Sequence, residues 1–81
     1  MIDDLKTFDG ALHRLTHDTL IHLVRQSGAL SVVRVAIPAA WDAAAFAEGM
    51  SRNYAGRGHH GVRVFVVPTD GEPRLLSVAI G

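Results

Sequence analysis

Two histidines have the spacing in this chain that most directly suggests chemistry. His13 and His17 are four positions apart, so on a helix two imidazoles at this spacing could share a metal ion, with a histidine from elsewhere as a further ligand. Position 14 holds arginine, whereas the metalloprotease pattern His-Glu-x-x-His requires a glutamate there as general base. We therefore interpret both residues as half-exposed histidines beside the apolar stripe of a helix and expect no metal or other cofactor. A histidine metal site is kept as an alternative.

A glycine-rich segment, residues 56–61, invites comparison with phosphate-binding loops, because its sequence is Gly-Arg-Gly-His-His-Gly. The segment follows the C-terminal end of an expected helix, where the helix dipole repels anions. No Gly-Lys-Ser/Thr sequence precedes a helix anywhere in the chain. We interpret the segment as a helix cap and a flexible connection.

Basic residues gather around that segment, since positions 49–69 contain no acidic side chain. Arginines at such a patch could contact nucleic-acid phosphates while Tyr54 stacks on a base. An acidic protein partner fits the same charge pattern. The basic and histidine residues of the patch are Arg52, Arg57, His59, His60 and Arg63.

Trp41 is the only tryptophan, and it lies near the start of a stretch with helical periodicity, positions 39–54. On a helical wheel it lies opposite the apolar stripe formed by Phe46, Met50 and Tyr54, which predicts an exposed aromatic side chain of the kind that anchors protein interfaces. The alternative is that Trp41 folds back over the edge of the sheet.

Catalytic patterns are scarce. The chain has no cysteine, which excludes disulfides, thiolate metal sites and cysteine nucleophiles, and no serine lies in a Gly-x-Ser-x-Gly context. Asp3, Asp4 and Asp9 cluster near the N-terminus rather than in an expected pocket. A histidine acid/base paired with Asp18 or Asp70 is left open. We expect a protein without enzymatic activity.

Length and composition predict a single small domain. The chain has 81 residues, 48% of them hydrophobic, and eight basic side chains balance eight acidic ones. The zero net charge removes the overall basic field of a dedicated nucleic-acid-binding protein. The longest run without a charged residue, positions 26–33, is much shorter than the roughly 20 residues of a membrane helix. No signal peptide is recognisable, so we expect a cytoplasmic protein without membrane contact.

The elements follow from periodicity and from breaking residues. After a polar leader at positions 1–10, a single domain occupies residues 11–81. Apolar residues recur with helical spacing in 11–27 and 39–54, and β-branched residues are frequent in 30–37. Segments 62–67 and 75–80 predict two further strands, and the turn residues between them predict an antiparallel hairpin.

This order predicts a two-layer α+β sandwich of the type α-β-α-β-β. A helical crossover makes the first two strands parallel, so the three-stranded sheet is mixed, and both helices lie on one face. The third strand has no charge between Leu75 and Ile80, whereas the first contains Arg34 and the second contains Arg63 and Pro68. Because charges and prolines favour edges, we place the third strand in the centre, in the order 1-3-2.

These features favour a small non-enzymatic interaction module that binds another protein or itself as a homodimer. A nucleic-acid-binding module using Arg52, Arg57 and Arg63 is the alternative, and a histidine metal-binding protein comes third. The expected partner-binding residues are Trp41 and the five residues of the basic patch.

Overall fold

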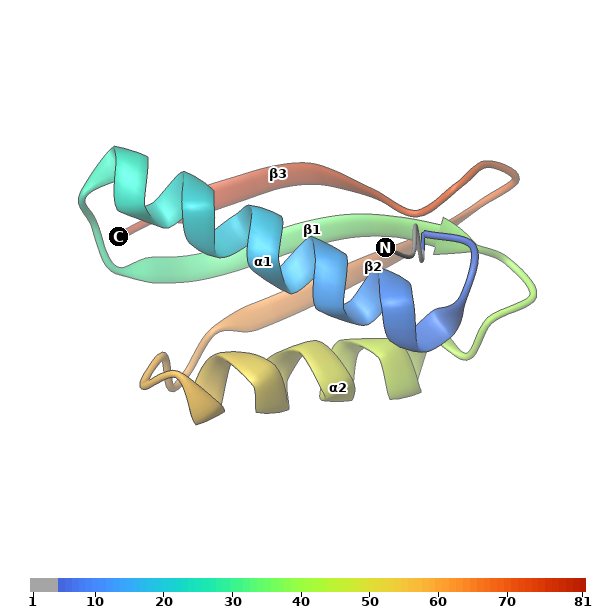
Figure 1. Ribbon diagram of the computed structural model, residues 1–81, viewed down its shortest axis with the longest axis horizontal. Coiled ribbons are helices and arrows are strands. Elements are labelled where there is room, and N and C mark those ends of the chain that lie inside the picture. The colour runs from blue at the N-terminus through green and yellow to red at the C-terminus, as the bar shows by residue number, and fades with distance from the viewer. Residues whose placement is uncertain (1–4) are drawn as a thin grey trace.

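The protein folds into two helices and a three-stranded sheet in a computed structural model that describes residues 5–81 (Figure 1). The four residues before this range include Asp3 and Asp4, which therefore lie outside the described part. The elements in chain order are α1 (Phe8–Gln26), β1 (Leu30–Pro38), α2 (Ala43–Gly56), β2 (Arg63–Thr69) and β3 (Arg74–Ile80).

Helix α1 begins three residues earlier than the apolar periodicity predicts. Thr7 is its N-cap, and the Thr7 hydroxyl accepts a hydrogen bond from the Gly10 amide at 3.1 Å. This bond satisfies an amide that has no partner inside the helix. The predicted leader at positions 1–10 is therefore too long, since Phe8 to Gly10 belong to the helix. The helix ends where Ser27 adopts a left-handed conformation and donates its amide to Leu23.

The sheet has the order β2-β1-β3. Strand β1 pairs in parallel with β2, with Val33 opposite Val64. On its other side β1 pairs antiparallel with β3, with Val33 opposite Val78. The two-layer α+β class, the mixed three-stranded sheet and the parallel pairing of the first two strands are confirmed.

The predicted strand order 1-3-2 is wrong, because β1 is central and β3 is an edge strand. The expected hairpin is wrong for the same reason, since β1 lies between β2 and β3. Arg34 misled the prediction. It projects from a sheet face that no helix covers, so a charge in mid-strand needs no edge position there.

Both helices pack on the same face of the sheet, as predicted. Helix α1 contacts β1 and β3, helix α2 contacts β2, and the two helices contact each other (Figure 1). Val33, Val35 and Ile37 of β1 are completely buried under this layer. Phe46 and Met50 of α2 fill the space between helix and sheet. The core therefore lies on one side of β1 only, and the opposite face of the sheet stays open.

Gly49 permits the close approach of the two helices. A Cβ atom at this position would lie 2.8 Å from Leu12 Cδ2 of α1, which is shorter than any ordinary carbon contact. A larger residue would force the Leu12 side chain to move.

Candidate interaction surface on the open sheet face

Strand alternation decides which side chains project from the open face of the sheet. Val64 and Val66 of β2 pack against the core, so Arg63, Phe65 and Val67 project to the other side. The same alternation directs Arg34 of β1 outward. We call this uncovered side the open sheet face; its other outward residues are Val32, Arg74, Ser77 and Ala79. Ala36 faces the same side but is completely buried.

Phe65 is the most prominent apolar side chain of the open sheet face. It is 51% exposed and lies directly opposite Arg34 on the central strand. Val32, Arg34, Phe65, Val66 and Val67 line a hollow of about 410 Å³ across β1 and β2. On β3, Leu76 has no residue opposite it in β1 and is 41% exposed. A β-bulge at this position thus exposes Leu76 as a second apolar side chain.

The predicted basic patch does not form one continuous surface. Arg63 belongs to the open sheet face, whereas Arg52 is exposed on α2, in the helical layer. Arg57 follows α2 and directs its guanidinium to the Asn53 carbonyl at 3.4 Å. The structure therefore divides these three arginines between the two layers.

The glycine-rich segment caps α2, as predicted. The Arg57 amide donates to Tyr54 and the Gly58 amide donates to Ala55, while Gly58 and Gly61 have positive φ angles of 89° and 80°. Such angles suit residues without a side chain. His59 and His60 lie in this connection, and neither belongs to the open sheet face.

Trp41 contacts the apolar stripe instead of lying opposite it. It precedes α2, whose N-cap is Asp42, and its ring is 6.0 Å from Phe46 and 5.7 Å from Phe8. The helical wheel predicted an exposed Trp41 opposite the stripe, because position 41 was included in the expected helix. Trp41 is half-buried and packs on the core. It folds back as the alternative expected, but its ring contacts are with Phe8 and Phe46 of the two helices rather than with the edge of the sheet.

Tyr54 cannot stack on a base, because its side chain is 0% exposed. Burial raises the pKa of Tyr54 to about 12, and Thr19 beside it offsets only part of this effect. The Thr19 hydroxyl donates its own proton to the Leu15 carbonyl at 2.7 Å. Tyr54 is therefore a core residue with a neutral hydroxyl.

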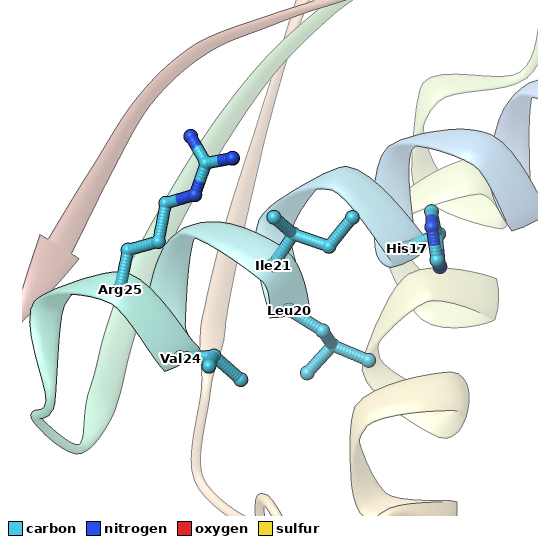
Figure 2. A pocket seen from close by; sticks show the side chains of 5 residues that line it. All are labelled: His17, Leu20, Ile21, Val24 and Arg25. Atoms are coloured by element: carbon cyan, nitrogen blue, oxygen red, sulfur yellow. The ribbon is translucent and has the colours of Figure 1, made fainter.

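The two histidines with helical spacing are exposed on α1. His17 borders a hollow of about 280 Å³ with Leu20, Ile21, Val24 and Arg25, and Val24 is 77% exposed there (Figure 2). Among residues 5–81, no three histidine or acidic side chains come together as metal ligands.

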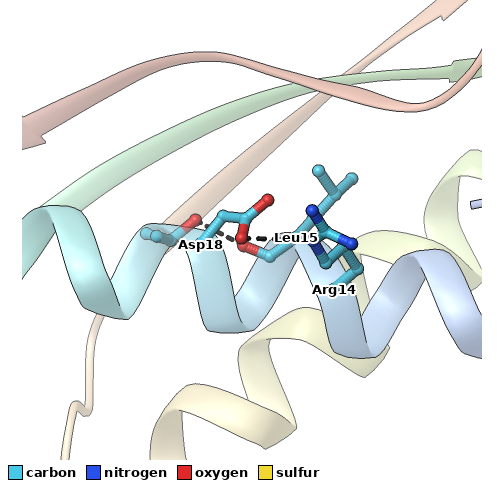
Figure 3. Close-up of polar contacts among 4 residues, drawn as sticks. Arg14, Leu15 and Asp18 are labelled. Carbon is cyan, nitrogen blue, oxygen red and sulfur yellow. Dashed lines mark hydrogen bonds and ion pairs between the residues drawn. The ribbon is translucent and has the colours of Figure 1, made fainter. Parts of the chain in front are cut away.

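Asp18, a candidate partner for a histidine acid/base in the sequence, contacts an arginine in the structure. Arg14 Nε donates to the Asp18 carboxylate at 3.3 Å, one turn away on α1 (Figure 3). Both side chains are substantially exposed, so this pair contributes little to stability. Asp70 is exposed in the β2–β3 connection, far along the chain from α1.

Comparison with protein families, curated proteins and solved structures finds no match to this chain. Within residues 5–81, neither helix combines the length and the apolar character needed to cross a bilayer.

Phe65 and Arg34 were missing from the predicted site. Strand alternation could have identified Phe65, because residues 63–67 of a strand point alternately to the two sides of the sheet. Two helices cover one side of a sheet, so one of the two sets must face outward. The register with β1 was needed to place Arg34 beside Phe65.

Proposed function

We propose that this protein is a small non-enzymatic interaction module whose partner binds to the open sheet face. The observation that carries the proposal is Phe65, a large aromatic side chain 51% exposed in the middle of a strand, directly opposite Arg34. Aromatic and arginine side chains dominate the energy of many interfaces, because both bury a large area on binding. A cytoplasmic location is part of this proposal.

Charge argues against a second copy on this face. Arg34, Arg63 and Arg74 project from the three strands, and no strand contains an acidic side chain. Two open sheet faces in contact would bring the arginines of both copies together without a compensating carboxylate. A partner for this face therefore has a different surface from the protein itself.

Photocrosslinking tests the proposal in cells that produce the protein. We expect Phe65→p-benzoylphenylalanine to give several times more covalent adducts than the same substitution at Ala44, because Ala44 is exposed in the helical layer. Adducts are separated by mass and then treated with protease or nuclease to determine their class. Equal yields at the two positions would remove the open sheet face from consideration.

Self-association is a second candidate function, favoured by the outer edge of β3. No strand of the described chain pairs with this edge, and Leu75–Ile80 contains neither charge nor proline. Unprotected edges of this kind pair with other strands. An antiparallel pair of β3 strands would join two sheets across a two-fold axis.

Sedimentation equilibrium tests this second candidate. We expect dimers whose dissociation constant increases at least about tenfold in Ala79→Lys, because two-fold pairing of the edges brings the added charges close together. Ala44→Lys adds the same charge on α2 and should leave the equilibrium unchanged. A protein that stays monomeric over the whole concentration range would contradict self-association.

A further inference from the structure

The charges of the described residues are segregated between the two layers. The strands contribute only arginines to the open sheet face, whereas every acidic side chain lies on a helix, at a helix cap or in a connection. The acidic residues within 5–81 are Asp9, Asp18, Asp42, Glu48, Asp70 and Glu72. A neutral chain thus presents a positive sheet face, and an anionic ligand complements it.

Arg34 and Arg63 are both close neighbours of the exposed aromatic ring. Arg34 lies opposite Phe65 on the neighbouring strand, and Arg63 is two positions from Phe65 on the same face. Such neighbours are roughly 5 to 7 Å apart between their Cβ atoms. Neither arginine forms an ion pair in the described part of the chain. Arg74 is less available, because its guanidinium lies against Gly71 in the connection that carries Asp70 and Glu72.

We infer that the ligand of the open sheet face is a single-stranded nucleic acid, an inference that rests on the proposed function. An unpaired base stacks on Phe65, and the flanking phosphates contact Arg34 and Arg63. Stacking on an aromatic side chain accepts any base, while arginines follow the phosphate backbone. The hollow beside Phe65 gives the base a place on the sheet.

A single strand would use both the aromatic ring and the two arginines of the open sheet face. A duplex hides the faces of its bases, so it could use the arginines but not Phe65. An acidic protein could also pair with the arginines, but it would not require an aromatic ring at position 65. The juxtaposition of a half-exposed ring and two unpaired arginines therefore favours unpaired bases.

Fluorescence anisotropy with labelled oligo(dT) and oligo(U) tests the inference on the full chain. We expect dissociation constants on the order of 10 µM at moderate salt. Two phosphate contacts predict a slope of about −1.4 for the logarithm of affinity against the logarithm of salt concentration. Affinity should thus fall roughly sevenfold between about 50 mM and about 200 mM salt.

Matched variants separate stacking from charge. Phe65→Ala should weaken binding roughly tenfold without changing the salt slope, whereas Phe65→Tyr should stay within about twofold. Arg34→Gln should reduce the magnitude of the slope by about 0.7. Arg52→Gln removes an exposed arginine from the helical layer and should leave both affinity and slope unchanged.

Three results would overturn the inference. Duplex DNA or poly-glutamate could bind as tightly as the single strands, which would show that the face recognises charge alone or an acidic protein. Phe65→Ala could leave affinity unchanged. Binding could be undetectable up to about 1 mM protein, well above the usual range for non-specific sites. If protein adducts still form at position 65 in that case, the proposed function stands and only the ligand class is wrong.

Discussion

Replacement of Phe46 by alanine will lower the free energy of unfolding by about 4 kcal/mol. Phe46 is completely buried between α2 and the sheet, and its ring packs against Phe8 at 5.2 Å and Trp41 at 6.0 Å. Removing the ring eliminates these contacts and leaves a cavity that the surrounding helix and sheet can fill only in part. Urea denaturation followed by circular dichroism measures the change.

The matched control for this substitution is Phe65→Ala, which removes the same ring from the open sheet face. Its effect on stability should stay within about 1 kcal/mol, because the ring is half-exposed in the folded chain. A chain of this length has roughly 4 to 12 kcal/mol of stability in total, so Phe46→Ala could fail to fold. Phe46→Leu then provides a measurable loss of about 1 to 2 kcal/mol. Equal losses of unfolding free energy at positions 46 and 65 would contradict the exposure of Phe65 on the open sheet face.

Alkaline pH will destabilise the protein through Tyr54. Burial raises the pKa of Tyr54 to about 12, above the ordinary 10.0 that applies to the unfolded chain. Below about pH 10 the Tyr54 hydroxyl is neutral in both the folded and the unfolded chain, so the free energy of unfolding does not yet decrease through this group. Between about pH 10 and about pH 12 only the unfolded chain releases the proton, so the free energy of unfolding falls by about 1.4 kcal/mol per pH unit. The total loss is about 3 kcal/mol.

Tyr54→Phe provides the control, because Tyr54 is the only tyrosine of the chain. In this variant the free energy of unfolding should no longer show the decrease between about pH 10 and about pH 12 that Tyr54 causes. The Tyr54 hydroxyl lies beside Thr19 without a well-formed hydrogen bond in the described part of the chain. The substitution should thus change stability at neutral pH by less than about 1 kcal/mol. Ultraviolet absorbance of tyrosinate with a midpoint near the ordinary pKa would contradict this burial.

Several elements of the fold could be predicted because local chemistry determines them. Apolar spacing identified both helices, and the glycine-rich segment 56–61 was correctly interpreted as the cap of α2. The expected strand 30–37 differs from β1 by one residue only. The N-terminus of α1 was placed too late, since its first residues lack the apolar period and depend on the Thr7 cap. The Trp41 prediction failed similarly, because the cap at Asp42 excludes position 41 from α2.

The candidate site was predicted only in part. Arg63 was among the expected residues, but it shares a surface with Phe65 and Arg34 rather than with Arg52 and Arg57. Residues that are close along the chain suggested a patch, whereas alternation along β2 turned one of them to the opposite side of the protein. Proximity in the sequence therefore did not predict a shared surface.

Element order, the two-layer class and the parallel relation of β1 and β2 could be predicted from the residues alone, because periodicity, breaking residues and the handedness of crossovers depend on short segments of the chain. The central position of β1 could not be predicted in this way. Strand order depends on which faces are covered, and that is a property of the assembled layers. With two helices on one side, Arg34 can project from a central strand into solvent beside Phe65. Because no helix covers this face, the charge of Arg34 does not mark an edge strand. The same uncovered face forms the candidate interaction surface.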